Sequence, residues 1–288
     1  MGHLALNLPY HCILSDQYRA FPERAGRWRR VKVPESARLQ LDGGVVLRRF
    51  AFPSPYTETR GRRLAFMSDL HYHGTPAEER RIASLVEALT DAAPDLLLVG
   101  GDAIGDAADL HLASGVLRRL SACAKAAVAV PGNWERGKRW LDVGFWRDFY
   151  ADGGFDLLCN EYRDLGFCGV YGGDDLVHGD PLPPPNFPVD GKFRILLLHR
   201  PDAVISCDTG SRLEPFGLAL CGHTHGGQWR LPGAGALYIP CLYRRRFDCG
   251  WFGKESSSIR MFVSTGAGEL SLPGRFNCPR EAVVIESV

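Results

Sequence analysis

The sequence predicts an α/β fold in which strands alternate with helices around a mainly parallel β-sheet. Short apolar runs closed by Gly, Pro or Asp have the length of fully buried strands, and they lie at 64–68, 96–99, 126–130, 195–198 and 218–220. Helical patterns follow several of these runs, which is the order that β-α-β units produce. Beyond residue 225 the chain becomes Gly-rich and aromatic, which favours a second sheet packed on the first with helices outside.

The elements can be justified in order along the chain. A first strand is expected at 45–52, pairing with 64–68. Thr75, Pro76 and Glu78 form a capping-box pattern, so a helix should begin there. The remaining expectations are helices around 110–120 and 140–150, a loop with five prolines at 176–188, and strands at 236–243, 259–263 and 282–285.

The chain is long enough for a large core, and we expect one main domain with an extension. Residues 1–40 carry scattered prolines and a basic cluster, and they are interpreted as an irregular extension lying on that domain. Residues 41–288 are expected to form a single domain. The basic cluster itself is interpreted as a solvated face.

Composition excludes several classes of protein. The net charge of +1 gives no bulk electrostatic reason to expect nucleic acid as a partner. Nine cysteines without a C-x-x-C pair favour the reduced thiols of a cytosolic protein over a disulfide framework. The start of the chain does not resemble a signal peptide, and no run approaches the roughly 20 apolar residues of a membrane span. We therefore expect a soluble, cytoplasmic protein.

Each of the five apolar runs ends in residues that bind metals. These endings are Asp69-x-His71, Gly101-Asp102, Gly132-Asn133, His199 and Gly222-His223-x-His225. Taken singly, each has a structural alternative such as a helix cap, a turn or a sheet edge. Taken together they are difficult to explain by packing, because buried polar groups are costly unless they are satisfied. Parallel strands present their carboxyl ends at one edge, so these side chains should converge in a number that suits two ions.

These motifs, in this order, resemble those of the calcineurin-like metallophosphoesterases. Longer strings at 222–228 (GHTHGGQ), 230–232 and 272–281 are similar to a bacterial branch that contains phosphodiesterases and UDP-2,3-diacylglucosamine pyrophosphatases. The resemblance covers roughly residues 45–288. It implies a four-layer α/β sandwich, with two central mixed β-sheets flanked by helices, and makes the domain at 41–288 catalytic.

The resemblance also implies which residues hold the two metals. One ion would be held by Asp69, His71 and His225, the other by Asn133, His199 and His223, with Asp102 as the bridge. Of these, Asp102, Asn133 and His199 are expected to serve catalysis most directly. Carboxylate, amide and imidazole ligands suit divalent ions, and we expect manganese, with iron, zinc and magnesium as alternatives. Two ions ~3.5–4 Å apart lower the pKa of a bridging water and clamp both oxygens of an in-line displacement at phosphorus.

One position departs from the family pattern. The family usually reads Gly-Asn-His-Asp/Glu, and its histidine protonates the leaving group, whereas this chain has Trp134 at that place. An indole donates a hydrogen bond but no proton, and Trp134 either faces the substrate or packs as a core aromatic. General acid help is worth ~10²–10⁴-fold, so alkoxide leaving groups should suffer more than a phosphate. His73 is a candidate replacement acid, with a plain surface histidine as the alternative.

Other residues around the motifs are candidates for binding or support. Arg200 could reach a phosphate oxygen, or form a surface pair with Asp202. Glu135 is expected to orient a ligand, and Asp106 either does the same or caps a helix. The segment 238–252 mixes aromatic residues with three arginines, which suits a membrane contact or an anionic amphiphile. Its alternative is a core strand followed by a solvated loop.

We therefore expect metal-dependent hydrolysis of a phosphodiester or pyrophosphate bond. The concrete candidate is UDP-diacylglucosamine hydrolysis in lipid A biosynthesis, which would place a cytoplasmic protein on the inner membrane face. The enzymatic alternative is a small-molecule or cyclic-nucleotide phosphodiesterase. The alternative from another class is a non-catalytic protein-binding scaffold of the same fold, against which the complete ligand set argues.

Overall fold

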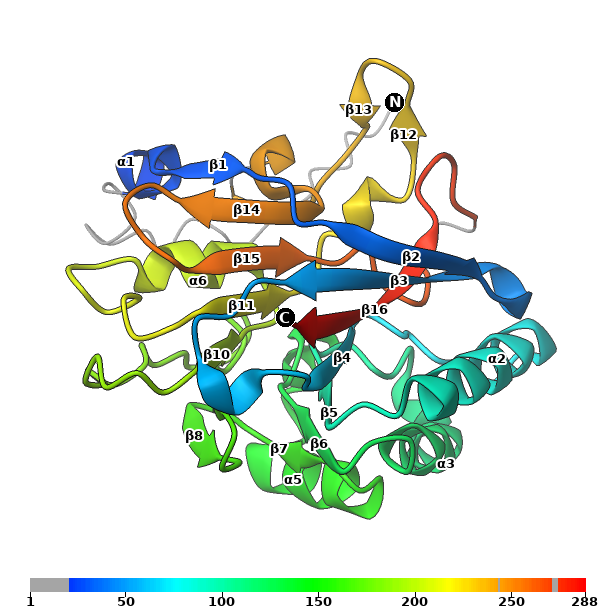
Figure 1. Ribbon diagram of the computed structural model, residues 1–288. Coiled ribbons are helices and arrows are strands. Elements are labelled where there is room, and N and C mark those ends of the chain that lie inside the picture. Colours follow the sequence, from blue (N-terminus) through cyan, green and yellow to red (C-terminus); the bar gives the residue numbers. More distant parts are fainter. Residues whose placement is uncertain (1–20, 243, 271–273) are drawn as a thin grey trace.

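Two seven-stranded mixed sheets pack face to face in the computed structural model, which describes residues 21–242, 244–270 and 274–288 (Figure 1). The first sheet runs in the order β2 (Glu35–Gln40), β3 (Val45–Phe52), β16 (Arg280–Ser287), β4 (Arg63–Met67), β5 (Leu96–Val99), β6 (Ala126–Ala129), β7 (Asp156–Leu157). The second runs in the order β1 (Trp28–Arg30), β14 (Gly250–Lys254), β15 (Arg260–Val263), β11 (Leu218–Cys221), β10 (Arg194–Leu197), β9 (Gly169–Gly172), β8 (Glu161–Asp164). The predicted α/β class is confirmed.

Helices flank the sheets, and a small hairpin stands apart from them. The helices are α1 (Phe21–Gly26), α2 (Pro76–Ala92), α3 (Leu110–Ser121), α4 (Asn133–Gly137), α5 (Val143–Asp152) and α6 (Pro201–Cys207). The hairpin consists of β12 (Arg230–Leu231) and β13 (Gly235–Ala236), and it projects beyond both sheets at the top of Figure 1. No helix in the described part of the chain is long and apolar enough to cross a bilayer.

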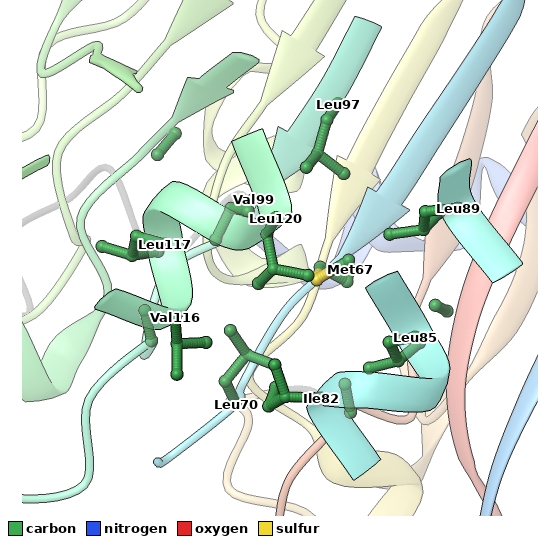
Figure 2. Close-up of a cluster of buried hydrophobic side chains, with 14 of the residues drawn as sticks. Met67, Leu70, Ile82, Leu85, Leu89, Leu97, Val99, Val116, Leu117 and Leu120 are labelled. Atoms are coloured by element: carbon green, nitrogen blue, oxygen red, sulfur yellow. The ribbon is translucent and has the colours of Figure 1, made fainter. Parts of the chain in front are cut away.

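Three hydrophobic clusters separate the four layers. Along β4 the side chains alternate, so that Ala65 and Met67 face the helices while Leu64 and Phe66 face the other sheet. Figure 2 shows the first cluster, in which α2 and α3 pack their apolar faces on Met67 and its neighbours. A third cluster lies between the second sheet and α6. The central strands β5, β10 and β11 are thus buried on both faces, as their unbroken apolar runs predicted.

The predicted helices are present with the expected signals. Thr75 and Glu78 form the complete capping box at the start of α2. The helix expected around 140–150 begins later, at Val143, because the Asp142 side chain accepts a hydrogen bond from Phe145 N and caps it. The stretch 176–188 contains no helix or strand, as its prolines predicted.

Two predictions about strands were wrong. The strand 45–52 does not pair with 64–68, because β16 lies between them, parallel to β3 and antiparallel to β4. The apolar run at 282–285 is buried on both faces, and that requires a central place in the sheet. The expected strand at 236–243 is limited to the end of the β13 hairpin, whereas β14 at 250–254 was not foreseen.

Residues 21–40 differ from the irregular extension that was expected. They form α1 and the edge strands β1 and β2, one on each sheet. Trp28 fixes this segment: its ring is buried, and its Nε1 donates to Asp208 Oδ2 at 3.2 Å. Sheet edges offer unpaired backbone groups, which accounts for strand formation here. Residues 1–20 lie outside the described part of the chain.

Candidate metal centre

The polar endings of the five predicted strands meet where the two sheets adjoin. Strands β4, β5 and β6 run parallel in one sheet, and β10 and β11 run parallel in the other. Loops that leave their carboxyl ends carry the seven candidate ligands Asp69, His71, Asp102, Asn133, His199, His223 and His225. The side chains therefore converge from two sheets, whereas a single sheet edge was expected.

The backbone at this place is unusually strained. Five of the candidate ligands have positive φ: Asp69 (55°), His71 (40°), Asp102 (54°), His223 (68°) and His225 (50°). Such conformations are uncommon for residues other than glycine, and they cluster at functional sites. Two glycines in the ligand loops leave room for the carboxylates of other loops. A Cβ on Gly222 would lie 2.3 Å from Asp69 Oδ2. Gly132 stands in the same relation to Asp102 Oδ1, at 2.1 Å.

Asp69, His71 and His225 form one compact group. The two imidazole Nε2 atoms are 3.1 Å apart, and His225 Nε2 lies 3.4 Å from Asp69 Oδ1. All three ligand atoms lie within 4.8 Å of one another, and all three side chains are buried. Three donors facing one small space is the arrangement that a bound cation requires.

Asp102, His199 and His223 form the second group, again within 4.8 Å. His199 Nε2 lies 3.3 Å from Asp102 Oδ2 and 3.0 Å from Asn133 Oδ1, so the amide oxygen joins this group. Asp102 Oδ2 is also 3.7 Å from His71 Nε2, in the first group. Asp102 thus stands between the two groups, in the place where a bridging ligand is needed.

Hydrogen bonds orient the imidazoles. His199 Nδ1 donates to the Gly100 carbonyl at 2.7 Å, which leaves Nε2 facing Asp102 and Asn133. His223 Nε2 lies 2.7 Å from the Pro240 carbonyl, so a residue beyond the hairpin positions this ring. Such contacts fix the tautomer and direction of metal-binding histidines.

The electrostatics of the group fit divalent cations. Burial raises the pKa of the Asp69 carboxyl to about 7; the Asp102 carboxylate adds to this increase, and His199 opposes it. Burial lowers the pKa of His71 to about 4 and that of His225 well below its usual range, so both rings are neutral and keep a lone pair. Buried carboxylates beside neutral imidazoles and an amide are a donor set that borderline divalent metals satisfy.

Glu135 connects two of the ligand loops through hydrogen bonds to their backbones. Its carboxylate accepts hydrogen bonds from the backbone N–H groups of Asp102, Ala103 and Gly132 at 2.9–3.0 Å. Tyr150, on α5, donates to the same carboxylate at 3.0 Å. Glu135 therefore orients the ligand Asp102 through the main chain. Sequence reasoning did not single out Tyr150, because its place in the predicted helix around 140–150 does not indicate a hydrogen-bond partner.

Trp134 stands at the edge of the site. Its ring is half-buried and meets His71 edge to face, with 5.2 Å between ring centres. Its backbone N–H donates to Asp102 Oδ1 at 2.8 Å, and Lys138 Nζ lies 5.2 Å from the ring centre. These contacts place Trp134 against the candidate ligands His71 and Asp102, at the edge of the metal centre.

Arg200 is buried, and it pairs with Asp175 rather than with Asp202. Its Nε donates to Asp175 Oδ1 at 2.7 Å, while Nη1 reaches to 2.6 Å from His223 Nε2. Asp202 instead accepts a hydrogen bond from Leu242 N at 3.0 Å. Sequence reasoning missed Asp175, because an aspartate next to a proline-rich loop carries no signal of a buried ion pair.

The structure does not bring Asp106 to the ligands. Asp106 is exposed, and its carboxylate accepts a hydrogen bond from Ala108 N at 3.2 Å, which is the capping alternative. His73 is largely exposed and pairs with Asp109 at 2.9 Å. Arg275, for which no role was foreseen, is half-buried beside His225, with 3.3 Å between its Nη2 and the ring Nδ1. Only its place within the string at 272–281 marked it.

The segment 238–252 divides into two parts. Trp251 and Phe252 are buried in β14, so the core strand lies at the end of the segment, whereas the alternative expected it at the start. Tyr238 and Leu242 are exposed, and they belong to the surface near the hairpin. Tyr243 and the side chains of Arg244 and Arg245 lie outside the described residues.

Comparison with known proteins identifies a family that matches this part of the chain. The family model described as calcineurin-like phosphoesterase matches residues 62–227, a range that contains all seven candidate ligands. The chain is 31% identical over 240 residues to "Phosphodiesterase YaeI" of Escherichia coli (strain K12), covering 78% of this chain and 82% of that protein. It is 30% identical over 213 residues to "Uncharacterized metallophosphoesterase YkuE" of Bacillus subtilis (strain 168), covering 70% and 71%.

Proposed function

The chain belongs to the calcineurin-like phosphoesterase family and is a metal-dependent phosphoesterase, and from this premise we propose that it hydrolyses phosphodiester or pyrophosphate bonds. The observation that carries the proposal is the pair of buried ligand groups with Asp102 between them. A scaffold that only bound proteins would gain nothing from burying two carboxylates and four imidazoles in one place, since such burial is costly without a cation.

Two divalent ions are assigned to these groups. Asp69, His71 and His225 would hold one, Asn133, His199 and His223 the other, and Asp102 would contact both. We propose manganese, with iron, zinc and magnesium as alternatives, because oxygen and imidazole donors suit these metals. Two such ions, when bound, supply Lewis acidity at phosphorus and lower the pKa of water.

The remaining residues of the site favour good leaving groups. Trp134 beside His71 carries no transferable proton, so a departing alkoxide receives no general acid from this position. Arg200 is engaged by Asp175, and it places positive charge beside His223, where an anionic substrate benefits. A phosphate or an aryloxide leaves without protonation. The site is therefore expected to favour diesters and pyrophosphates over alkyl monoesters.

A nucleotide-linked lipid is the finer proposal for the substrate. The strings at 222–228 and 272–281 support UDP-diacylglucosamine, and so do the exposed Tyr238 and Leu242 near the site. Such a substrate would place the protein in the cytoplasm, at the inner membrane face. A small-molecule or cyclic-nucleotide phosphodiesterase is the alternative, favoured by the likeness to a relative named phosphodiesterase.

The test is kcat/KM of the manganese-loaded protein for diesters and monoesters of graded leaving-group pKa. We expect kcat/KM to fall steeply as that pKa rises, and alkyl monoesters to be the poorest substrates. Release of UMP from UDP-diacylglucosamine, compared with a soluble UDP-sugar, tests the finer proposal. A flat dependence on leaving-group pKa, or a preference for phosphoserine-like monoesters, would contradict the first proposal; equal turnover of the two UDP compounds would contradict the second.

A further inference from the structure

An apolar groove of about 450 Å³ opens beside the candidate metal centre. Its walls come from Trp229, Leu237, Tyr238, Pro240 and Leu270, and His225 lies in the lining. The volume is in the range of sites that bind small molecules. Three of the wall residues are exposed, Trp229 by 38%, Leu237 by 51% and Tyr238 by 70%. Apolar residues gathered at a surface in this way mark contact with an apolar partner.

Several contacts connect the hairpin and the groove to the metal centre. Trp229 and Phe276 form a β-bridge, and their rings stack with 6.2 Å between centres. The turn that carries His225 packs closely against the segment after β13, because a Cβ on Gly227 would lie 2.6 Å from the Tyr238 carbonyl. Pro240, a wall residue, also positions His223 through its carbonyl at 2.7 Å. A molecule in the groove therefore lies next to both groups of candidate ligands.

The lining selects an apolar occupant. Two polar side chains of the lining are engaged elsewhere: Thr224 Oγ1 donates to the Asp248 carbonyl at 2.6 Å, and Gln228 Oε1 accepts from Leu270 N at 2.5 Å. The walls are mainly aromatic and aliphatic, whereas a nucleobase or a sugar needs several hydrogen-bond partners. Arg275 lies beside His225, a residue of the lining, with 3.3 Å between its Nη2 and the ring Nδ1. An apolar groove with a candidate metal ligand in its lining and an arginine next to that ligand complements an anionic amphiphile.

We propose that the groove binds a long alkyl or acyl chain of the substrate, whose phosphorus lies at the metal centre. This inference rests on the proposed function and names the substrate class of that site. The occupant is a part of the substrate itself, because the groove leads to His225 and does not stand apart as a separate surface. A bilayer surface and a second copy of the chain are outcomes that the test separates.

The first arm of the test is turnover of alkyl 4-nitrophenyl phosphodiesters from methyl to octyl, below their micellar concentrations. Burying a methylene fully is worth roughly fourfold in affinity, so a groove open on one side should raise kcat/KM roughly twofold per methylene. Leu237→Ser, in the wall, should flatten this dependence. Leu231→Ser is the matched control, because Leu231 is a similarly exposed leucine of the same hairpin, at 44%, and does not line the groove.

The second arm measures binding without turnover. Calorimetry of the manganese-loaded protein should give a Kd for octylphosphonate at least tenfold below that for methylphosphonate, and Leu237→Ser should remove the difference. This difference without hydrolysis of any diester would support the groove and refute the proposed function. Hydrolysis with no dependence on chain length, and equal Kd values, would overturn the groove alone. Equal effects of Leu231→Ser and Leu237→Ser would also overturn it, since the whole hairpin face would then be a bilayer or dimer contact.

Discussion

Trp134 is the residue at which this site differs most from the pattern that its motifs resemble. A histidine at this position would supply a proton, whereas the indole packs beside His71 and supplies none. The change costs little in the fold, because the backbone N–H of Trp134 still binds Asp102 at 2.8 Å. Its consequence is therefore confined to the choice of leaving group.

Trp134→His should raise kcat on alkyl-leaving substrates by about tenfold or more, because it restores a general acid near the leaving group. Activity on 4-nitrophenyl esters, which need no acid, should change little. Trp134→Phe is the control, since it removes the indole N–H without adding a proton donor. Steady-state kinetics of the three proteins decide the matter, and equal gains from His and Phe would show that ring size, not proton donation, matters.

Asp175 is the buried partner on which Arg200 depends. Burial raises the pKa of this carboxyl, but Arg200 at 2.7 Å, together with His178 and His199, lowers it more, so the folded-state pKa is well below the usual value. The pair thus contributes stability above the unfolded-state pKa of ~3.9, and this contribution is lost as the pH falls below that value.

Asp175→Asn should lower the free energy of unfolding by about 3 kcal/mol at pH 7, because it leaves the Arg200 charge buried and unpaired. Urea unfolding should show a constant difference from wild type above about pH 5 that shrinks below about pH 4. Glu161→Gln, which removes the partner of Arg147 in an exposed pair, should have little effect. A difference that grew toward low pH would have the wrong sign for a carboxylate with a lowered pKa.

At the scale of elements, the ligands are held by turns between strands and helices. The loop after β5 and the loop before α4 share one acceptor, the Glu135 carboxylate, which binds three backbone N–H groups and Tyr150. Positive φ at Asp102 is maintained by this network, so the geometry of the bridging ligand depends on a residue that does not touch the metal.

Glu135→Gln should weaken manganese binding by about 10–100-fold, because the amide N–H₂ then faces backbone donors that need an acceptor. Unfolding free energy should fall by about 2–4 kcal/mol for the same reason. Tyr150→Phe removes a single hydrogen bond from the same carboxylate, and it should cost about 1 kcal/mol with little change in metal affinity. Calorimetric titration of both variants with manganese tests this, and similar losses in the two would contradict it.

Elements with local signals could be predicted from the sequence, and those that depend on distant partners could not. The capping box of Thr75 and the apolar runs before each ligand motif are local, and both were found at the expected positions. The place of β16 between β3 and β4 depends on pairing across more than 200 residues, which no local pattern reports. Strand β14 was not predicted, because its Gly and Trp residues were interpreted as part of an amphiphilic surface.

At the scale of the whole molecule, the site exists because two sheets pack face to face. One sheet delivers Asp69, His71, Asp102 and Asn133, and the other delivers His199, His223 and His225. The sequence motifs predicted this set but not its supports, which depend on tertiary structure. Arg275 contacts the ligand His225 directly, whereas Asp175 acts through Arg200 and Tyr150 acts through Glu135. The groove beside His225 also requires the fold, because its walls come from residues 229–240 and from Leu270.

The measurement that tests the account most directly is the number and place of metal ions in the manganese-reconstituted protein. Elemental analysis should give two equivalents per chain, and anomalous scattering should place them on either side of Asp102. Asp102→Ala should lose both occupancy and activity, because it removes a ligand that both ions share. A fully reconstituted protein with no metal near Asp102 would contradict the account.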